Sequence, residues 1–433
     1  KSFRNLFRCF GVDSELLKLN LYSDDSTYLY KDNYEFTSFA KPVLNLNKET
    51  QLDGTVYLSS SNGHTYLDSS EGNEEQYTSM TFECEAIFPY KFQPFETGYF
   101  PTPFVSSSIA GFHRAVANAS DFTWHTSDTD LRMYVVKESN ESRHAKFVLT
   151  GSGVKLESSV FRDVFDNNKW ILAARVKHSK YPFAGFNVTG ATGGNYIVEF
   201  YGVNSVANDV NNEFSLSQTV NSTIGTNLLG HRKRIYAGAH RQNFTGSTVL
   251  QSSEVKVSQV RFWQSHLSDE EIKQHSYDPT NYGLIHPYRS DAIFQVSGSE
   301  TVYVPQIETL ALHWDFMNVT SSDSNGRFVV NDISSGSAEF ANEYSMIGKI
   351  TKNKYNGYAE FFDTSSVNVV DKEFIYTAKK RLPDEVYSSD GVKIKTEETE
   401  NFFEDDAVAD HFYMFEKSPY NAVSQQMISF FGS

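Results

Sequence analysis

Cysteine, proline and long apolar runs are scarce or missing in this sequence. It has two cysteines, Cys9 and Cys84, and 11 prolines among 433 residues. Two cysteines cannot build a disulfide scaffold, so a hydrophobic core must hold the fold together. No apolar run reaches the ~20 residues that a transmembrane helix needs, and the start does not resemble a signal peptide. We therefore expect a soluble protein without a membrane partner.

Basic residues are the second shortage. Lys and Arg number 38 against 54 Asp and Glu, which gives a net charge of −16. A broad nucleic-acid surface needs a basic field that matches the phosphates, so this balance disfavours nucleic acid as a partner. It also disfavours docking on an anionic membrane. The local basic run at 231–234 (HRKR) is interpreted as a solvated turn.

Aromatic residues are abundant, with 35 Phe and 25 Tyr, and the composition is typical of β-rich proteins. Apolar residues occupy alternate positions from Met80 to Phe88, which predicts a strand with Glu83 and Glu85 on its other face. We expect this other face to meet solvent or the neighbouring sheet. Residues 89–112 hold several Pro and Phe and are expected to form a long irregular loop. Similar short strands and polar turns recur between Tyr28 and Tyr282 with few helices. This pattern predicts an antiparallel β-sandwich or jelly roll.

The stretch Val255–His275 shows this organisation best. Its apolar positions alternate as in a half-buried strand, and the phase slips by one at Ser258–Gln259, which suggests a β-bulge. Ser268 stands three residues before Glu271, the spacing of a helix capping box. We therefore expect a strand that leads into a short capped helix.

Four segments are expected along the chain. Residues 1–27 are predicted to form a helical connector and residues 28–283 the sandwich. A second β-rich region with an acidic loop is expected over 284–410, and it begins with a connector at 284–305. Residues 411–433 have apolar positions at helical spacing, and we expect an amphipathic helix that continues beyond Ser433.

The segment 57–283 resembles the laminin-G-like, concanavalin A-like jelly-roll domains. The stretches that carry this resemblance are TFECEAIF (81–88), KWILAARV (169–176), YIVEFYGV (196–203), KRIYAGAHRQNFTG (233–246) and VKVSQVRFWQSHLSDEEIKQH (255–275). The resemblance covers just over half of the chain and implies a jelly roll. Such domains often bind glycans or proteins, sometimes through a calcium ion at the rim.

More loosely, the whole chain is similar to segments of large virion proteins of tailed bacteriophages. The similarity lies in NLFRCFGVDSELLKLNLY near the start, LALHWDF at 310–316 and FEKSPYNAVSQQMISFF near the end. It implies a structural part of a virion that contacts other virion subunits or copies of itself.

One loop region, residues 121–130, offers candidate binding residues. Asp121, Asp128 and Asp130 could provide oxygen ligands to calcium, but such residues are also common in turns and no complete ligand set is present. We therefore expect no cofactor and keep calcium as an alternative. Trp124 lies in a polar loop and is the candidate for stacking on a sugar, whereas Trp170 and Trp263 lie in patterned strands and are expected in the core.

Catalytic patterns are not found in the sequence. Related sandwiches include glycan hydrolases that use paired carboxylates on one strand face, and Glu83 and Glu85 have this spacing. No zinc, P-loop or nucleophile-elbow motif is present. We expect a non-enzymatic structural or assembly protein. The alternatives are a glycan-binding module for host attachment and, third, a glycan hydrolase.

Overall fold

A computed structural model of the protein describes most of the chain between residues 34 and 334 and a few short segments on either side. The described ranges are 22–23, 26–27, 34–60, 79–114, 129–151, 153–181, 194–206, 209–230, 233–241, 248–278, 280–296, 300–317, 319–320, 328–334, 355–360 and 370–380. Two compact units are distinguished, one of residues 1–36 with 378–433 and one of residues 37–377. In the first unit, β1 (Tyr22–Ser23) pairs antiparallel with β2 (Ser26–Thr27).

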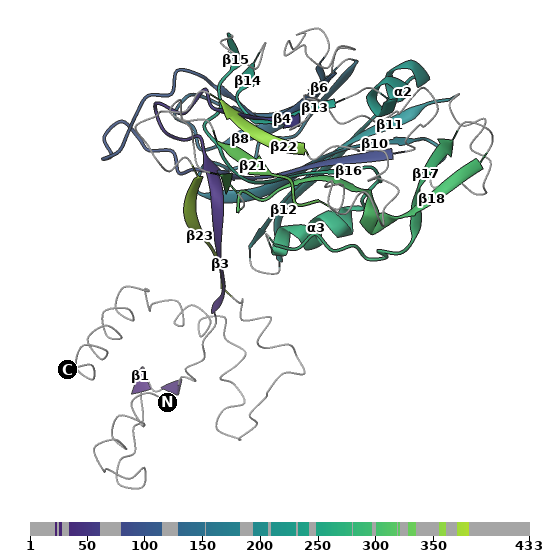
Figure 1. Ribbon diagram of the computed structural model, residues 1–433. Coiled ribbons are helices and arrows are strands. Elements are labelled where there is room, and N and C mark those ends of the chain that lie inside the picture. The colour runs from purple at the N-terminus through teal and green to yellow at the C-terminus, as the bar shows by residue number, and fades with distance from the viewer. Residues whose placement is uncertain are drawn as a thin grey trace. The chain divides into compact units, whose positions relative to one another are not determined.

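The second unit is mainly β, and its two large sheets form the layers of a sandwich (Figure 1). We call them the first sheet and the second sheet. The order of strands in the first sheet is β12 (Asp209–Val220), β11 (Tyr196–Val206), β10 (Asn168–His178), β5 (Ser79–Phe88), β16 (Lys256–Trp263), β3 (Tyr34–Asn45) and β23 (Val370–Lys380), and β19 (Leu310–Trp314) also pairs with β16.

The second sheet has nine strands. Their order is β20 (Val319–Thr320), β21 (Val329–Asn331), β22 (Tyr355–Glu360), β4 (Thr55–Ser60), β13 (Lys233–Gly238), β6 (Ser106–Arg114), β7 (Thr129–Lys137), β8 (Ala145–Gly151) and β9 (Val154–Glu157). The registered pairs in both sheets are antiparallel, for example Leu172 opposite Cys84 and Tyr236 opposite Gly111. The predicted fold class, an antiparallel β-sandwich with short helices, is confirmed.

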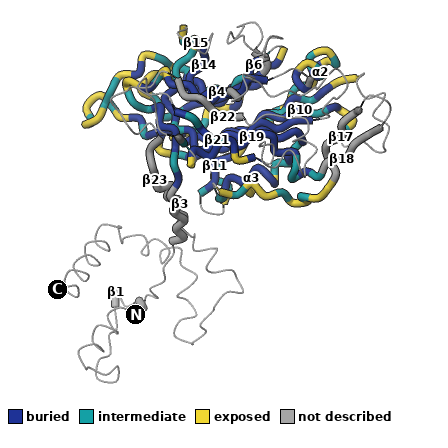
Figure 2. The backbone as a smooth tube through the Cα atoms, in the orientation of Figure 1, coloured by how far each residue is buried: buried dark blue, intermediate teal, exposed yellow. Residues whose placement is uncertain are grey.

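The core lies between the two sheets and is rich in aromatic rings. Phe82 of the first sheet meets Phe112 of the second edge to face, with ring centroids 5.8 Å apart. Trp170 and Phe147 form a second contact across the layers, at 4.7 Å. Strands β10 of the first sheet and β6 of the second are buried along most of their length, as Figure 2 shows. The alternation between Met80 and Phe88 thus predicts the core face of β5 correctly, because alternate side chains of a strand point to one face.

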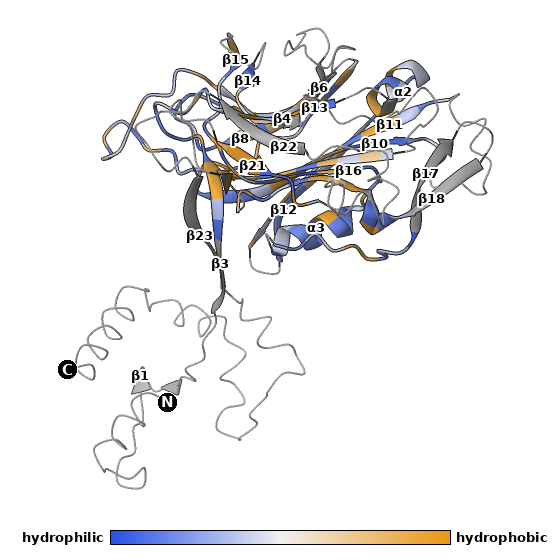
Figure 3. Ribbon diagram, in the orientation of Figure 1, coloured by the Kyte–Doolittle hydropathy of each residue, from blue (hydrophilic) through white to orange (hydrophobic). Residues whose placement is uncertain are grey.

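The outer face of the first sheet is also covered. Helix α3 (Asp269–Tyr277) packs on β10 and β11, and Figure 3 shows polar and apolar residues along its ribbon. Ile272 of this helix joins Ile171, Tyr201 and Trp263 of the sheet in a buried apolar cluster. Because both faces are covered, all ten residues of β5 are buried. None of the described helices is long and apolar enough to cross a membrane.

Both local predictions for 255–275 are confirmed. The register of β16 against β5 shifts between Val257 and Gln259, which is the expected bulge. At the start of α3, the Glu271 backbone N–H donates to the Ser268 hydroxyl over 3.3 Å, and the Ser268 backbone N–H donates to the Glu271 carboxylate over 2.8 Å. This reciprocal pair is the capping box that the spacing predicts.

Several strands expected in a separate region at 284–410 belong to the two sheets. β5 pairs along one edge of β16, and the other edge is shared by β3 and β19. β22 pairs with β4, and β21 with β22. These strands satisfy edge N–H and C=O groups that would otherwise be left unpaired. The sandwich therefore extends beyond the boundary predicted at residue 283.

Three other predictions need correction. The expected connector at 284–305 contains an antiparallel pair, β17 (Ser290–Val296) with β18 (Glu300–Pro305). The expected loop at 89–112 contains β6, which lies between β13 and β7. Lys233 and Arg234, expected in a solvated turn, lie buried in β13, since their aliphatic stems can pack while their charged groups find partners.

The remaining short elements connect these layers. They are α2 (Ser222–Gly230), which buries Leu228 and Leu229 in the core, the pair β14 (His240–Arg241) and β15 (Val249–Gln251), and the 3-10 helix η2 (Gln306–Thr309). The expected helical connector at 1–27 is described only at β1 and β2, and the acidic stretch at 396–410 and the expected helix at 411–433 lie outside the described residues.

Candidate ligand pocket beside helix α3

The outer face of the first sheet carries a network of buried charges. Its members are Lys41, Glu83, Glu85, Lys169, Arg175 and Arg261, all of which are buried. The expectation that Glu83 and Glu85 meet solvent or the neighbouring sheet is wrong, because α3 and the segment that follows it lie over this face. His275 of α3 contacts Glu83 directly. Buried charges are stable only where opposite charges and hydrogen bonds compensate them.

Glu83 is compensated by three side chains. One carboxylate oxygen lies 3.0 Å from His275 Nδ1, and the other accepts from Trp263 Nε1 over 3.3 Å and lies 3.6 Å from Arg261 Nη1. Burial acts to raise the pKa of Glu83, but His275 and Arg261 outweigh it and hold the pKa below its ordinary value. Glu83 is therefore an anion at neutral pH. His275 Nε2 faces the Gly283 carbonyl at 2.8 Å, so both ring nitrogens meet acceptors.

Glu85 lies between two lysines. Its carboxylate accepts from the Ser258 hydroxyl over 2.5 Å and lies 3.6 Å from Lys169 Nζ and 4.0 Å from Lys41 Nζ. Burial acts to raise the pKa of Glu85, but the two ammonium groups lower it below its usual range. Burial in turn lowers the pKa of Lys41 to about 8, although Glu85 opposes this shift. The charges thus hold one another in place on a covered sheet face.

Polar contacts also fix α3 to the sheet at both ends. The Ser276 carbonyl accepts from Lys169 Nζ over 2.5 Å and from the Ser205 hydroxyl over 2.7 Å. Before the helix, the Leu267 carbonyl accepts from Arg175 Nη1 over 2.9 Å. These contacts satisfy carbonyl groups at and before a helix that has only 9 residues. They keep α3 over Glu83, so neither carboxylate of β5 opens to a cleft in the described part of the chain.

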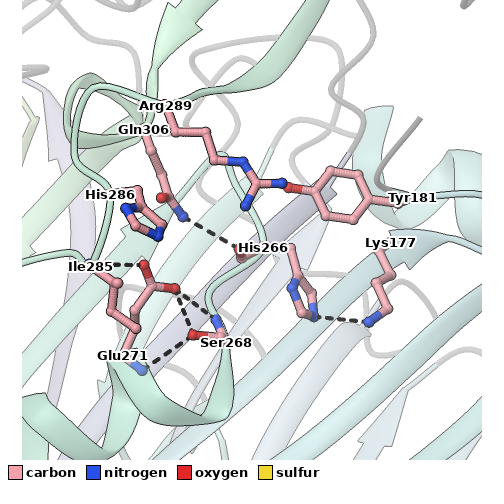
Figure 4. Close-up of a pocket in the computed structure, with 9 residues that line it drawn as sticks. All are labelled: Lys177, Tyr181, His266, Ser268, Glu271, Ile285, His286, Arg289 and Gln306. Carbon is pink, nitrogen blue, oxygen red and sulfur yellow. Dashed lines mark hydrogen bonds between the residues drawn. The ribbon is translucent and has the colours of Figure 1, made fainter. Parts of the chain in front are cut away.

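A pocket of about 340 Å³ lies beside the N-terminus of α3 (Figure 4). Five parts of the chain form it: the end of β10 with the residues after it, the turn before α3, the first turn of α3, the segment 285–289 and η2. The lining residues are Lys177, Tyr181, His266, Ser268, Glu271, Ile285, His286, Arg289 and Gln306. This size falls in the range of preformed small-molecule sites.

Glu199 lies beside the pocket and holds two of its lining residues, Lys177 and His266. It lies 2.7 Å from both Lys177 Nζ and His266 Nε2, and 3.0 Å from Arg175 Nε. Burial acts to raise its pKa, but the hydrogen bond from His266 and the charge of Arg175 lower the pKa of Glu199 to about 2. Burial also lowers the pKa of His266, although Glu199 opposes this. His266 Nε2 also lies 3.3 Å from Lys177 Nζ, so this nitrogen faces both groups.

Glu271 is the other carboxylate of the pocket, and its oxygens are engaged. One oxygen accepts from the Ser268 backbone N–H and hydroxyl, over 2.8 and 2.9 Å. The other accepts from the Ile285 backbone N–H over 3.3 Å. Arg289 differs, because no carboxylate among the residues with described side chains lies within ion-pair distance of its guanidinium. The pocket therefore pairs two satisfied carboxylates with a cation that has no counter-charge.

None of the binding residues predicted from sequence has a described side chain. Asp121, Asp128 and Trp124 lie outside the described residues, and Asp130 lies in β7, where its backbone alone is described. Within the described ranges, no group of three or more His, Cys, Asp or Glu side chains could hold a metal ion. Calcium binding and sugar stacking at these positions therefore stay predictions. Trp170 and Trp263 are buried, as predicted.

The pocket residues were missed by sequence reasoning. They come from segments as far apart as Lys177 and Gln306, and no short motif links them. A local signal does exist in the segment Asn281–Arg289, where Tyr282, Ile285 and Tyr288 are exposed beside His286 and Arg289. Aromatic and basic residues interleaved in a short loop are typical of binding surfaces.

Comparisons with known proteins add little to this description. No family model matches the chain, and no curated protein matches it. The native heptameric SAP-like pentraxin from Limulus polyphemus has a TM-score of 0.31 and 8% identity, over 60% of this chain and 90% of that chain. Tailspike protein 2 from Escherichia coli O157:H7 bacteriophage CAB120 has a TM-score of 0.29 and 9% identity, over 65% of this chain and 31% of that chain.

At these scores the two likenesses carry no argument about function. The described residues define a fold class. The protein is a mainly antiparallel β-sandwich with a charged sheet face that is covered by a short helix.

Proposed function

We propose that the chain is a non-enzymatic structural protein that uses its jelly-roll sandwich as a rigid module for contacts with other protein subunits. The observation that carries this proposal is the closed outer face of the first sheet. The two carboxylates with the spacing of a catalytic pair, Glu83 and Glu85, are covered and bound to His275, Arg261 and two lysines.

This arrangement differs from what glycan hydrolysis requires. A glycosidase needs two carboxyl groups on either side of an accessible bond, one of them protonated at working pH so that it can act as an acid. Here both carboxylates have a pKa below the ordinary value and are buried. Both carboxylates are charged, paired and covered. This supports a structural role, in which they make the sandwich rigid and favour one packing of α3 on the first sheet.

The finer assignment to the laminin-G-like jelly rolls is supported by the place of the resembling stretches. The five stretches quoted above run through β5, β10, β11, β13 and β16, five strands of the two sheets. The last of them continues into α3 with its capping box. The resemblance thus covers the part of the chain that forms the core.

We further propose that the subunits contacted are those of a tailed-phage virion, or other copies of this chain. Sedimentation velocity of the 433-residue chain, alone and with candidate virion subunits, tests this proposal. We expect association that shifts to larger species as concentration rises. A chain that stays monomeric and binds none of the subunits would contradict it, as would release of reducing ends from a polysaccharide that is lost in Glu83→Gln.

A further inference from the structure

We propose that the pocket beside α3 binds a sugar unit that carries a carboxylate, such as a uronate or sialate residue of a glycan. This site goes beyond the structural role proposed above and does not depend on it. Its lining residues do not include Trp124 or the acidic loop residues that the sequence offered as candidates.

The charge of the pocket points to an anion. Arg289 lacks a counter-charge among the described side chains, and Figure 4 shows its guanidinium extending across the pocket toward Tyr181. The nearby carboxylates of Glu199 and Glu271 already accept from side chains and backbone. Because their charges are compensated, they leave Arg289 available to a ligand. A guanidinium matches a carboxylate with two parallel hydrogen bonds.

The other groups of the pocket match hydroxyls on a ring. Buried Gln306 donates through Nε2 to the His266 carbonyl over 3.5 Å, and its Oε1 has no donor among the described residues. His266 Nε2 contacts Glu199 at 2.7 Å and Lys177 Nζ at 3.3 Å, and the Nδ1 atom has no hydrogen-bond partner among the described residues. Lys177, with 21% of its side chain exposed, adds a donor at the wall. An amide acceptor, an imidazole nitrogen and several donors around one cavity suit a polyhydroxylated ligand better than a simple anion.

Aromatic rings provide the third element of sugar recognition. Tyr181 lines the pocket and packs near the His266 ring at 5.7 Å. Tyr288 is 84% exposed in the segment that supplies Ile285, His286 and Arg289. An exposed tyrosine offers a flat apolar face and a hydroxyl, which suits the alternating CH and OH groups of a sugar. The volume of about 340 Å³ accommodates one such unit with part of the next.

The test is calorimetric titration of the full chain with a panel of uronate- and sialate-containing glycans. Each glycan that binds is compared with its carboxyl-reduced form, which keeps the ring and loses the charge. Acetate provides the carboxylate without a ring, and a short acidic peptide provides it on a different scaffold. We expect at least one acidic glycan to bind, with the reduced form, acetate and the peptide much weaker.

Two matched variants place the site. Arg289→Gln removes the exposed guanidinium that lines the pocket, and Lys180→Gln removes an exposed cation nearby that does not line it. We expect Arg289→Gln to weaken binding about 10- to 100-fold, the range for a hydrogen bond to a charged group, and Lys180→Gln to leave it unchanged. Thermal unfolding of both variants should match the parent.

Four results would overturn the proposal. They are no binding by any acidic glycan, equal binding of the carboxyl-reduced form, equal or tighter binding of acetate or the peptide, and equal effects of the two variants. Sedimentation of the parent chain separates this outcome from the structural role. Self-association of the parent chain without binding of any acidic glycan would contradict the pocket alone, and glycan binding by a parent chain that does not associate would contradict the structural role alone.

Discussion

Neutralising Glu85 should cost far more stability than neutralising Glu157, although both carboxylates lie between two lysines. Glu157 has the shorter contacts, at 2.8 Å to both Lys146 and Lys155, and it is partly exposed. Glu85 has contacts of 3.6 and 4.0 Å, and its side chain is fully covered. If distance determined the strength of the pairs, Glu157 would matter more. If burial determines it, Glu85 will dominate, because water screens exposed charges.

The magnitude for Glu85 follows from the charges left behind. Glu85→Gln removes the anion and leaves Lys41 and Lys169 buried without it. At an effective dielectric constant of ~20, each ion pair near 4 Å is worth about 4 kcal/mol before desolvation is counted. Breaking a buried pair from one side costs about 3–5 kcal/mol in measured cases. We expect a loss in this range, a large share of the ~5–15 kcal/mol that stabilises a typical domain.

The assay is urea unfolding followed by tryptophan fluorescence, with Glu157→Gln as the control. The Glu85 variant should unfold at clearly lower urea with an unchanged slope, and Glu157→Gln should stay within the error of the parent. Should Glu85→Gln prove too unstable to purify, Lys41→Met in the same background is the second variant, because it removes one uncompensated cation and should restore part of the loss. Equal costs for Glu85→Gln and Glu157→Gln would refute the reasoning.

Three further predictions concern single groups. Burial raises the pKa of the Cys84 thiol, so the folded Cys9→Ser variant should not react with Ellman's reagent until guanidinium unfolds it; reaction in native buffer would contradict this. Ser268→Ala removes the N-cap of α3 and should cost about 1 kcal/mol in urea unfolding, whereas exposed Ser179→Ala should cost nothing measurable. Glu199 has a pKa of about 2 when folded against 4.5 ordinarily, so the unfolded chain binds protons first and stability should fall from about pH 4.5 toward pH 2. A urea midpoint that is constant over that range would be inconsistent with this pairing.

Local patterns in the sequence predict individual elements well. The alternation from Met80 to Phe88 predicts β5, and the phase slip at Ser258–Gln259 predicts a bulge. The spacing of Ser268 and Glu271 predicts the start of α3. Each of these signals lies within a few residues, where sterics and backbone hydrogen bonding decide the structure.

The burial of a sheet face by residues that are distant in the sequence could not be predicted in the same way. Glu83 and Glu85 are polar residues at alternate positions, a pattern typical of a solvent-facing strand side. Glu83 is covered by His275, almost two hundred residues later, and a local pattern carries no trace of it. The pair β17 and β18 was also missed, although Ser297-Gly298 between two β-branched runs is a hairpin signal.

The candidate pocket illustrates the same limit. Arg289 and Gln306 are residue types that are common on protein surfaces. They line one pocket with Lys177 only because α3 and η2 pack on the first sheet. The sequence therefore predicts the scaffold, and the tertiary packing creates the site.

Hydrogen–deuterium exchange of the full chain tests the central claim most directly. If α3 is a fixed cover over Glu83 and Glu85, its backbone amides should exchange slowly, on the same timescale as those of β5 beneath it. The first turn should be protected by the Ser268–Glu271 capping box, and the Glu85→Gln variant should speed exchange in both elements together. Fast exchange in α3 beside slow exchange in β5 would show that the helix opens and exposes the carboxylates, which would contradict a closed structural face.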